Sequence, residues 1–530
     1  MQRACVQCHQ SFAVFERDQI YYQQLGVPTP TKCPQCRFQL RLSFRNERFL
    51  YQRNCQLCHQ PTLSQYATDK PYTIYCRQCW WSDQWDPLDF GQVIDWNRSF
   101  FEQFAEVKLQ VPRLGLLNDA DSENSDFCNR VNKLKNCYMI FDAVANESCI
   151  YGSGMYGNKD SVDCDYCDRV ELCYDCSYCT DSYGLRYSRD SVNCRDSALL
   201  VDCVGVSNSL MCVGLRNVQY CYKNKQLTQA EFQTVWNNSN FDKIEFEQFA
   251  LTIPRRYYQG VHNDDSSGDH LVNTHAVLNS FQVRDSENCG YCYGVHHAKD
   301  SYDYTIWGEQ AELMYEDHAC GGQCSKIWFG NVVWYGHDTL YCDHCLNGAI
   351  NCFGCVGLKN QQNCILNKQY SPDEYQQLSQ RLIEQMRLTG EYGHFFPASL
   401  SDFCYNETMA QEFFPLTKQQ ALASGWQWQD HLPGSYGQAD LAKQIYTCAA
   451  CTKNFRLIAP ELKFYQQQGI PLPIRCPDCR HAERMKYRSP YQLYNRQCMK
   501  PGCPNHFQTA YGPDRPEIIY CEDCYQKEMY

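Results

Sequence analysis

Sixteen of the 38 cysteines in this chain form the same spacing pattern twice, once near each end. Each copy contains four close pairs of cysteines, and the intervals between successive pairs are the same in both copies. Two close pairs about 15–25 residues apart are typical of a tetrahedral zinc site. We therefore predict four zinc ions, each bound by four thiolates. The predicted ligands are Cys5, Cys8, Cys33, Cys36, Cys55, Cys58, Cys76, Cys79, Cys448, Cys451, Cys476, Cys479, Cys498, Cys503, Cys521 and Cys524.

Both copies also indicate how the cysteines are positioned. A module of about 45 residues buries too little surface to fold alone, so zinc is expected to contribute about 10 kcal/mol or more. After Cys33 and after Cys476 the sequence becomes basic and helix-like. A helix that begins at a zinc knuckle and supplies ligands from its first turn is the treble-clef arrangement. The pair Cys498 and Cys503 is separated by four residues, where the first copy has two.

The terminal modules resemble a known family. Residues 4–45 and 447–488 both contain Cys-x2-Cys, an aromatic residue, a Gly-x-Pro element and Cys-Pro-x-Cys-Arg. This pattern is similar to a family described only as a probable zinc-ribbon domain. The family occurs in uncharacterised bacterial proteins, some of which share a cysteine-rich middle. The resemblance implies zinc binding and implies no established activity.

Basic side chains follow the second cysteine pair in each copy. They recur every few residues, so several share one helix face. Such a stripe suits contact with nucleic-acid phosphates. The alternatives are a solvated helix face or a face that forms salt bridges with the rest of the chain. The candidate nucleic-acid contacts are Arg37, Arg41, Arg45, Arg48, Arg480, Arg484, Lys486 and Arg488.

Charge is unevenly distributed along the chain. Residues 1–83 carry 10 basic and 5 acidic side chains, and residues 441–530 carry 13 and 8. The segment between them carries 25 basic and 47 acidic side chains, a net charge of −22. Four thiolates outweigh one divalent ion, so each predicted site adds about −2. This weakens any argument from overall charge to nucleic-acid binding.

The N-terminal sequence lacks a secretory signal, and no run of about 18 apolar residues is present to cross a membrane. We therefore expect a cytoplasmic protein without a membrane partner. A reducing compartment favours thiols and metal sites over disulfides. An exported protein held by disulfides is the alternative.

The middle of the chain is also duplicated. Residues 212–232 match residues 355–375 at an offset of 143, and the same offset aligns 134–142 with 277–285. We predict a multidomain, mainly β protein: two β-solenoid halves with short connecting helices, flanked by tandem treble-clef/zinc-ribbon modules. The predicted boundaries are 1–83 (tandem module), 84–117 (helical connector), 118–225 (solenoid half 1), 226–262 (helical connector), 263–370 (solenoid half 2), 371–440 (helical or irregular connector) and 441–530 (tandem module).

A repeating rhythm supports the solenoid prediction. In the first half many cysteines lie at multiples of nine residues, and Asn or Asp often precedes them. Asn or Asp turns the chain, after which a small apolar side chain enters the interior. Repetition of this unit stacks successive coils into a solenoid.

The solenoid cysteines allow two interpretations. They are either compact core residues or ligands for a further zinc ion or an iron–sulfur cluster. The ligand interpretation rests on Cys164, Cys167, Cys173, Cys176 and Cys179. The pattern lacks the proline of the ferredoxin motif.

The second half carries histidines and acids where the first has cysteines. A groove along the solenoid would gather some of them into a metal or acid–base site. This metalloenzyme alternative has His318, Cys320 and His337 as its first candidates. The full set is His296, His297, Glu312, Glu316, Asp317, His318, Cys320, Cys324, His337, Asp338, Cys342, His344 and Cys345.

The interpretation that we favour is a zinc-binding scaffold without catalysis. Four closed thiolate sites leave no open position on the metal. The partner is expected to be a protein or a nucleic acid, bound through the basic modules or the aromatic-rich solenoid. The RNA-, DNA- or ribosome-binding protein and the metalloenzyme remain the alternatives.

Overall fold

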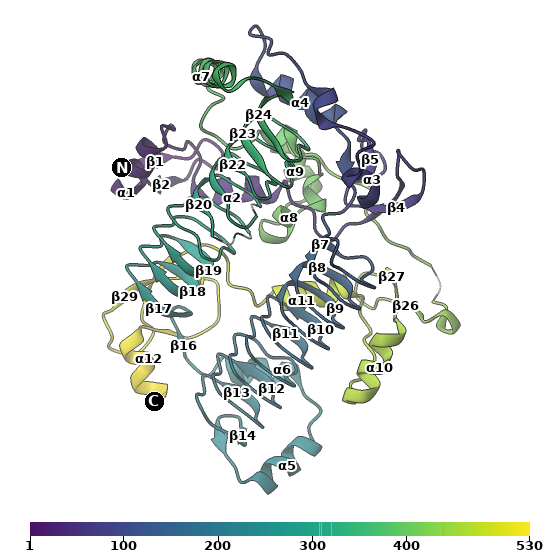
Figure 1. Cartoon of the computed structure of the whole chain (residues 1–530). Coiled ribbons are helices and arrows are strands. Elements are labelled where there is room, and N and C mark those ends of the chain that lie inside the picture. Colours follow the sequence, from purple (N-terminus) through teal and green to yellow (C-terminus); the bar gives the residue numbers. More distant parts are fainter. Residues whose placement is uncertain (307, 309, 320, 438, 530) are drawn as a thin grey trace.

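The computed structural model describes residues 1–306, 308, 310–319, 321–437 and 439–529 (Figure 1). It is mainly β, as predicted. Its helices are α1 (Glu16–Gln24), α2 (Pro34–Leu42), α3 (Arg77–Trp81), α4 (Phe100–Gln110), α5 (Gln229–Asn237), α6 (Lys243–Ala250), α7 (Pro372–Thr389), α8 (Met409–Phe413), α9 (Lys418–Ala423), α10 (Ala459–Gln468), α11 (Pro477–Met485) and α12 (Glu522–Met529), with 3-10 turns at Pro87–Phe90, Ala398–Leu400, Tyr405–Glu407 and Leu441–Lys443. Among the described residues, no helix has both the length and the apolarity that a membrane crossing needs.

Two β-solenoids, each built mainly of parallel strands, form the body of the molecule. The first contains β7 (Asn129–Asn132), β8 (Tyr138–Val144), β9 (Ile150–Tyr156), β10 (Val162–Asp165), β11 (Tyr174–Ser177), β12 (Ala198–Val201), β13 (Leu210–Val213), β14 (Cys221–Tyr222) and β15 (Lys225–Gln226). The second contains β17 (Gly260–Asp264), β18 (Gly268–His275), β19 (Ser280–Glu287), β20 (Glu312–Tyr315), β21 (Ser325–Trp328), β22 (His337–Leu340), β23 (Ala349–Phe353), β24 (Gln361–Ile365) and β25 (Lys368–Gln369).

Every third residue of the first solenoid points into its interior. Cys128, Val131, Leu134 and Cys137 lie three residues apart in one continuous buried core. The residue before each of them, such as Asn136, has a positive φ of 53° to 58°. A left-handed residue other than glycine costs about 1–2 kcal/mol, and Asn and Asp tolerate it best. This explains the predicted pattern of Asn or Asp before an inward side chain.

One coil is twelve residues long, not nine. Parallel β-bridges join residues that are twelve apart in the chain: Lys135 to Glu147, Glu147 to Lys159, and Lys159 to Glu171. Four inward residues per coil therefore give the solenoid four sides. Nine residues span three of the four sides, so the cysteine rhythm follows the correct inward phase but gives the wrong coil length.

Backbone hydrogen bonds join each coil to both neighbours. The amide of Lys135 donates to the carbonyl of Asn146 at 3.0 Å in the following coil. The amide of Asn136 donates to the carbonyl of Glu123 at 3.0 Å in the preceding coil. These bonds recur along the solenoid and offset the cost of its left-handed residues.

Polar side chains inside the solenoid form hydrogen bonds with the backbone of their own coil and of the next coil. The Ser188 hydroxyl donates to the carbonyl two residues earlier at 2.9 Å and accepts from the amide of Leu200, one coil later, at 3.1 Å. The Cys176 thiol donates to the carbonyl of Tyr174 at 3.4 Å. Small residues that bond within the coil therefore suit these positions.

The second solenoid has the same plan with occasional longer coils. Gly268 pairs with Ser280 at the usual twelve-residue step, whereas Glu312 pairs with Ser325 at a step that is one residue longer. The longer step also separates Lys299 from Glu312 and His337 from Ile350. The offset between the two halves thus grows along the chain, so a single offset of 143 is wrong for the earlier coils.

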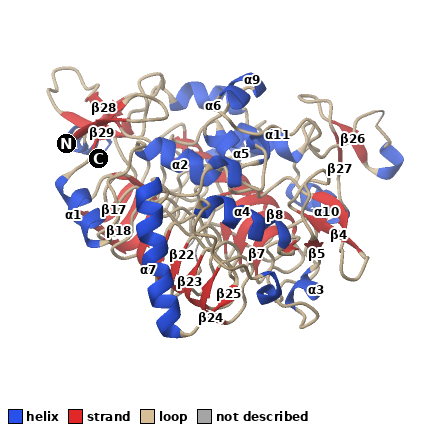
Figure 2. Cartoon of the chain, turned by 90° about the horizontal axis from the view of Figure 1, so that it is seen from above, coloured by secondary structure: helices blue, strands red, loops and turns tan. Residues whose placement is uncertain are grey.

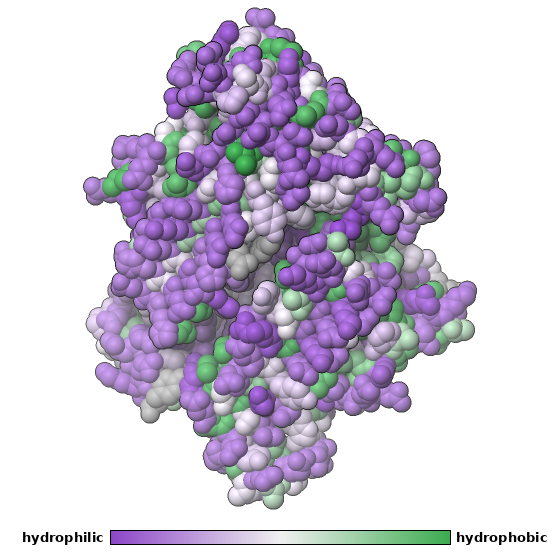
Figure 3. All heavy atoms as spheres, in the orientation of Figure 1, coloured by the Kyte–Doolittle hydropathy of each residue, from purple (hydrophilic) through white to green (hydrophobic). Residues whose placement is uncertain are grey.

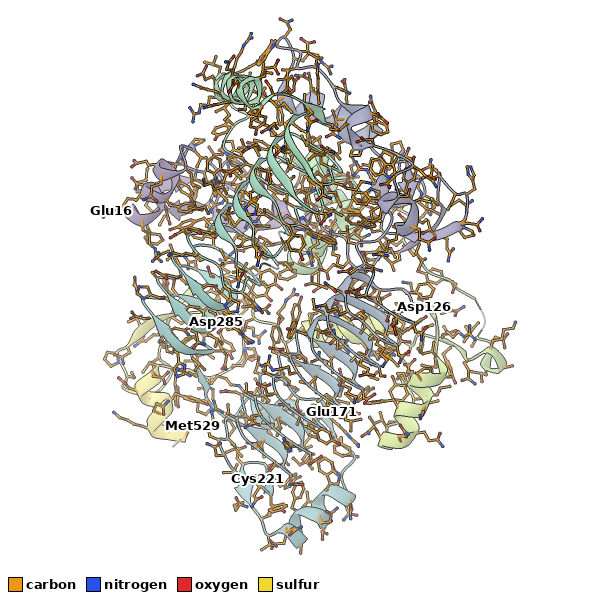
Figure 4. All side chains as sticks on the ribbon, in the orientation of Figure 1. Glu16, Asp126, Glu171, Cys221, Asp285 and Met529 are labelled. Atoms are coloured by element: carbon orange, nitrogen blue, oxygen red, sulfur yellow. The ribbon has the colours of Figure 1, made fainter. Side chains whose placement is uncertain are left out.

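The two solenoids lie side by side and run in opposite directions (Figure 1). Helices α5 and α6 connect the end of the first solenoid to the start of the second. Helix α7 then packs against β24, at the end of the second solenoid (Figure 2). Figure 4 labels Cys221 at the end of the first solenoid and Met529 in α12, the helix at the C-terminus of the chain.

Four small hairpin-and-helix modules lie at the chain ends, two at each end. Each begins with a two-stranded antiparallel sheet. The sheets are β1–β2 (Gln2–Ala4, Ser11–Ala13), β3–β4 (Tyr51–Asn54, Pro61–Ser64), β26–β27 (Ile445–Thr447, Asn454–Arg456) and β28–β29 (Tyr494–Gln497, His506–Thr509). We number the modules 1 to 4 in chain order.

The interior position of Cys176 yields a stability prediction. We expect Cys176→Ser to change the unfolding free energy by less than about 1 kcal/mol, because serine occupies equivalent positions elsewhere. Cys176→Phe should cost about 1–3 kcal/mol or more through overpacking. Urea unfolding followed by circular dichroism measures both. Equal midpoints for the two variants would show that the interior is not closely packed here.

Candidate metal centres

The structure brings the sixteen terminal cysteines together in four clusters of four. Within each cluster all sulfur atoms lie within 4.8 Å of one another. Sulfur–sulfur distances are 3.7 Å for Cys8 to Cys33 and 3.6 Å for Cys451 to Cys476. A tetrahedron with Zn–S bonds of about 2.3 Å has edges of about 3.8 Å. The thiols are therefore already spaced as a tetrahedral metal requires.

Two structural elements supply the ligands of every cluster. In module 1 the turn between β1 and β2 carries Cys5 and Cys8, and helix α2 carries the second pair. Cys33 is the N-cap of α2, and Pro34 occupies the first helical position. Modules 2, 3 and 4 repeat this arrangement with helices α3, α11 and α12. A hairpin turn facing a helix N-terminus is the treble-clef geometry predicted from the sequence.

Backbone amides point at the buried sulfur atoms. The amide of Cys33 donates to Cys5 Sγ at 3.2 Å, and the amide of Cys476 donates to Cys448 Sγ at 3.2 Å. Burial by itself raises the pKa of Cys448, but the hydrogen bonds from Cys476 and Cys451 outweigh it and lower the pKa to about 6. These contacts favour the thiolate form that binds metal.

Module 1 docks on the second solenoid through arginines of α2. Arg37 forms an ion pair with Asp303 at 2.9 Å, and both side chains are buried. Arg41 donates to the hydroxyl of Thr305 at 2.7 Å and pairs with Asp303 at 3.3 Å. The charge of Asp303 holds the pKa of Arg37 well above its usual value, despite opposing burial.

Module 3 docks on the first solenoid in the same way. Arg480 pairs with Asp163 at 2.8 Å, and Arg484 pairs with Asp165 at 2.6 Å. In the numbering of the chain, Arg37 and Arg480 differ by an offset of 443, and Asp163 and Asp303 differ by an offset of 140. Modules 1 and 3 therefore bind to corresponding coils of the two solenoids.

A tyrosine–carboxylate bond completes both interfaces. The Tyr291 hydroxyl donates to Asp18 at 2.9 Å, and the Tyr151 hydroxyl donates to Glu461 at 2.9 Å. These residues keep the offsets of 140 and 443. The duplication thus extends from the sequence to individual hydrogen bonds.

The arginines of the candidate nucleic-acid stripe have partners inside the protein. Besides the four guanidinium groups described above, Arg45 pairs with Glu47 at 2.5 Å and Arg488 pairs with Glu412 at 2.6 Å. Arg48 donates to Ser153 and keeps a side-chain exposure of 13%. Of the predicted set only Lys486 is exposed. The salt-bridge alternative is the one that these contacts support.

Modules 2 and 4 join the start of one solenoid to the end of the other. In module 2, β5 (Ile74–Tyr75) pairs with β6 (Arg113–Leu114), just before the first solenoid. Its Trp80 carbonyl accepts from Lys359 at 2.9 Å, in the last coils of the second.

Module 4 mirrors this bridge. Its β30 (Ile519–Tyr520) pairs with β16 (Arg255–Arg256), just before the second solenoid. Its Tyr525 hydroxyl donates to Asp202 at 3.0 Å, near the end of the first. Modules 2 and 4 therefore close the two antiparallel solenoids into one body.

The histidine and acid set of the second solenoid does not converge on one site. His318 is buried, and its Nδ1 lies 2.7 Å from Asn331 Oδ1. Asn331 bonds to Asp343, which also bonds to His344 at 2.5 Å. Burial lowers the pKa of His318 well below its usual value. The result is a buried polar network that links two of the predicted histidines.

The other members of the set have different environments. His337 bonds to Ser325 at 2.8 Å, and Asp338 pairs with Lys326 on the surface. Glu316 bonds to the amide of Phe395 and lies near Arg37. His296, His297 and Glu312 are exposed, Asp317, Cys324, Cys342 and Cys345 are buried, and Cys320 lies outside the described residues. Within the described part of the chain, the four terminal clusters are the groups of three or more donors at metal-binding distance.

The five cysteines considered for an iron–sulfur cluster are inward core residues. Cys164 stacks on Cys176 in the next coil. Cys167, Cys173 and Cys179 belong to the same buried core. The thiols donate to backbone carbonyls, as Cys179 does to Ser177 at 3.5 Å. The geometry supports the core interpretation of these cysteines.

Comparison with known families identifies one of the modules directly. Residues 443–488 match the model of a family described as "Probable treble clef domain". This segment is module 3. No curated protein matches the chain. The fold and the four cysteine clusters thus define a β-solenoid protein with treble-clef, metal-type modules at both ends.

The carboxylates that receive the modules were missed from the sequence. Asp163 and Asp303 both follow a serine by two residues, in segments 161–165 and 301–305. A search at the offset of 140 would find this repeat. Acidic residues in an acidic segment otherwise carry no sign of burial.

The docking pairs yield a prediction. We expect Asp163→Ala to destabilise the protein by about 3–5 kcal/mol, because Arg480 and Arg484 would lose a buried partner. Asp181→Ala is the matched control in the same solenoid, because its pair with Arg169 is exposed and worth less than about 1 kcal/mol. Urea unfolding measures both. Similar midpoints for the two variants would contradict the docking role of Asp163.

Proposed function

We propose that this protein is a zinc-binding scaffold without catalysis, in which four structural zinc ions hold two solenoids together. The observation that carries the proposal is the spacing of the four thiol clusters, which fits Zn–S tetrahedra. Cys5, Cys8, Cys33 and Cys36 would hold the first ion, and the three equivalent sets would hold the others. A zinc ion bound by four thiolates contributes folding energy and has no position free for substrate.

The positions of the modules support a bracing role. Modules 1 and 3 each contact the middle of a solenoid, and modules 2 and 4 each bridge the ends of both. In module 1 the buried cysteines Cys5, Cys33 and Cys36 form a small cluster of their own, with only Phe12 packed against it. Metal binding would therefore fix the helices that present Arg37 and Arg480 to the solenoids.

We propose a protein as the partner of this scaffold and a reducing compartment as its location. All seven arginines of the basic stripe pair with carboxylates of the protein, and the middle of the chain is strongly acidic. Both facts oppose binding to a phosphate backbone. The sixteen terminal cysteines are free thiols that could bind metal, which favours a reducing compartment such as the cytoplasm.

Metal content tests the scaffold directly. We expect the purified protein to contain four zinc ions per chain by elemental analysis. Cys36→Ala should reduce this to about three, because one tetrahedral site loses a ligand. Cys203→Ser is the control and should retain four, because Cys203 is an inward core residue. Iron in the protein, or unchanged zinc in Cys36→Ala, would contradict the assignment of the sites.

The partner class has its own test. Affinity purification should recover the same proteins with and without nuclease, and recovery should persist at high salt. Recovery of RNA or DNA whose binding falls steeply with salt would favour the nucleic-acid alternative instead. Lys486→Glu should leave the partners unchanged, because this exposed lysine is not required for a protein contact.

A further inference from the structure

A cleft of about 450 Å³ lies in the seam between the two solenoids. Both halves contribute to its walls. The surface is hollowed near the centre of the molecule, where the solenoids face each other (Figure 3). Asp285, one of the lining residues, is labelled on the second solenoid in Figure 4. The volume lies within the range of about 300–1,000 Å³ that is common for small-molecule sites.

Arg130 is the notable cation of this cleft. Its Nε donates to the carbonyl of Asn46 at 3.4 Å. In the described part of the chain, no carboxylate lies within ion-pair distance of its guanidinium group. The nearby carboxylates Glu47 and Asp142 are both bonded to Arg45. The positive charge of Arg130 is therefore left without a direct counter-ion.

The electrostatic setting of Arg130 agrees with this geometry. Burial lowers the pKa of Arg130, and the charge of Arg45 lowers it further. Arginine still keeps its proton near neutral pH. A partly buried guanidinium group without a partner is costly, so an anion entering the cleft would be stabilised by it.

The other arginines of the cleft are paired. Arg284 reaches from the second solenoid to Asp168 on the first, at 2.8 Å. Arg169 pairs with Asp168 and with Asp181, at 3.0 and 2.6 Å. These cations are already neutralised, which singles out Arg130.

Aromatic side chains and an unpartnered amide oxygen complete the lining. Tyr156 and Tyr335 come from opposite halves and are 54% and 50% exposed. Trp334 adds a third ring. The buried Oδ1 atom of Asn132 has no hydrogen-bond partner in the described structure. The cleft thus offers a cation and aromatic surfaces to a ligand.

We propose that this cleft binds a small aromatic anion, whose carboxylate or phosphate pairs with Arg130 and whose ring lies against the tyrosine and tryptophan side chains. An aromatic carboxylic acid and a mononucleotide share this chemistry. Both solenoids line the cleft, so a bound ligand would contact both of them.

Titration calorimetry at neutral pH and low salt tests the proposal on the full zinc-loaded chain. The probes are 4-hydroxybenzoate and adenosine monophosphate, which separate the two sources of the anion. Phenol, adenosine and inorganic phosphate are the controls, since each lacks either the anion or the ring. We expect at least one aromatic anion to bind with a Kd below about 1 mM, and each control to bind at least tenfold more weakly.

Variants then assign the binding to Arg130. Arg130→Gln should weaken the bound probe at least tenfold, and Arg130→Lys should retain binding because it keeps the charge. Arg169→Gln is the matched control, with an arginine in the same cleft that is already paired, and should bind as the wild type does. Circular dichroism confirms the folding of each variant. Binding of neither aromatic anion, full binding by Arg130→Gln, or an equal loss in Arg169→Gln would overturn the proposal.

Discussion

The architecture depends on a buried contact that occurs twice: an arginine pair on a treble-clef helix meets carboxylates on a solenoid coil. Arg37 on Asp303 and Arg480 on Asp163 occupy equivalent places in the two halves. Buried ion pairs are stabilising only when geometry and hydrogen bonding are held accurately. Metal bound at the cysteine clusters, at the start of the same helices, would provide that accuracy. The cysteines and the arginines would therefore act together in docking each module on its solenoid.

The solenoids explain why such bracing is useful. A twelve-residue coil encloses four small side chains, so its core is narrow and each coil contacts only its neighbours. Every third residue has a left-handed backbone, which adds cost. Two such rods acquire long-range order when modules 2 and 4 tie the start of one to the end of the other. The seam between them, with Arg130 and Arg284, is a consequence of this antiparallel arrangement.

Much of the fold could be predicted from local signals. Cysteine spacing predicts the four clusters because close pairs and intervals reflect ligand geometry directly. Asn or Asp before a small residue predicts the inward phase of the solenoid. The cysteine rhythm does not give the coil length, because nine and twelve share the factor of three, and only the pairing of Lys135 with Glu147 distinguishes them. The sequence leaves a solvated face, salt bridges and nucleic-acid contacts open for the arginine stripe, because burial between distant segments leaves no local trace. The carboxylate at Asp163 and the unpaired Arg130 depend on such long-range packing.

On the proposed function, metal binding in the modules holds the solenoid coils in place. Hydrogen exchange by mass spectrometry, before and after removal of metal under reducing conditions, tests it most directly. Without metal, exchange should become faster in the module-contacting coils of both halves, at β10, β11 and residues 290–306. Helix α5, which lies at the tip between the solenoids, should change least. Unchanged exchange in those coils after complete loss of metal would contradict the claim.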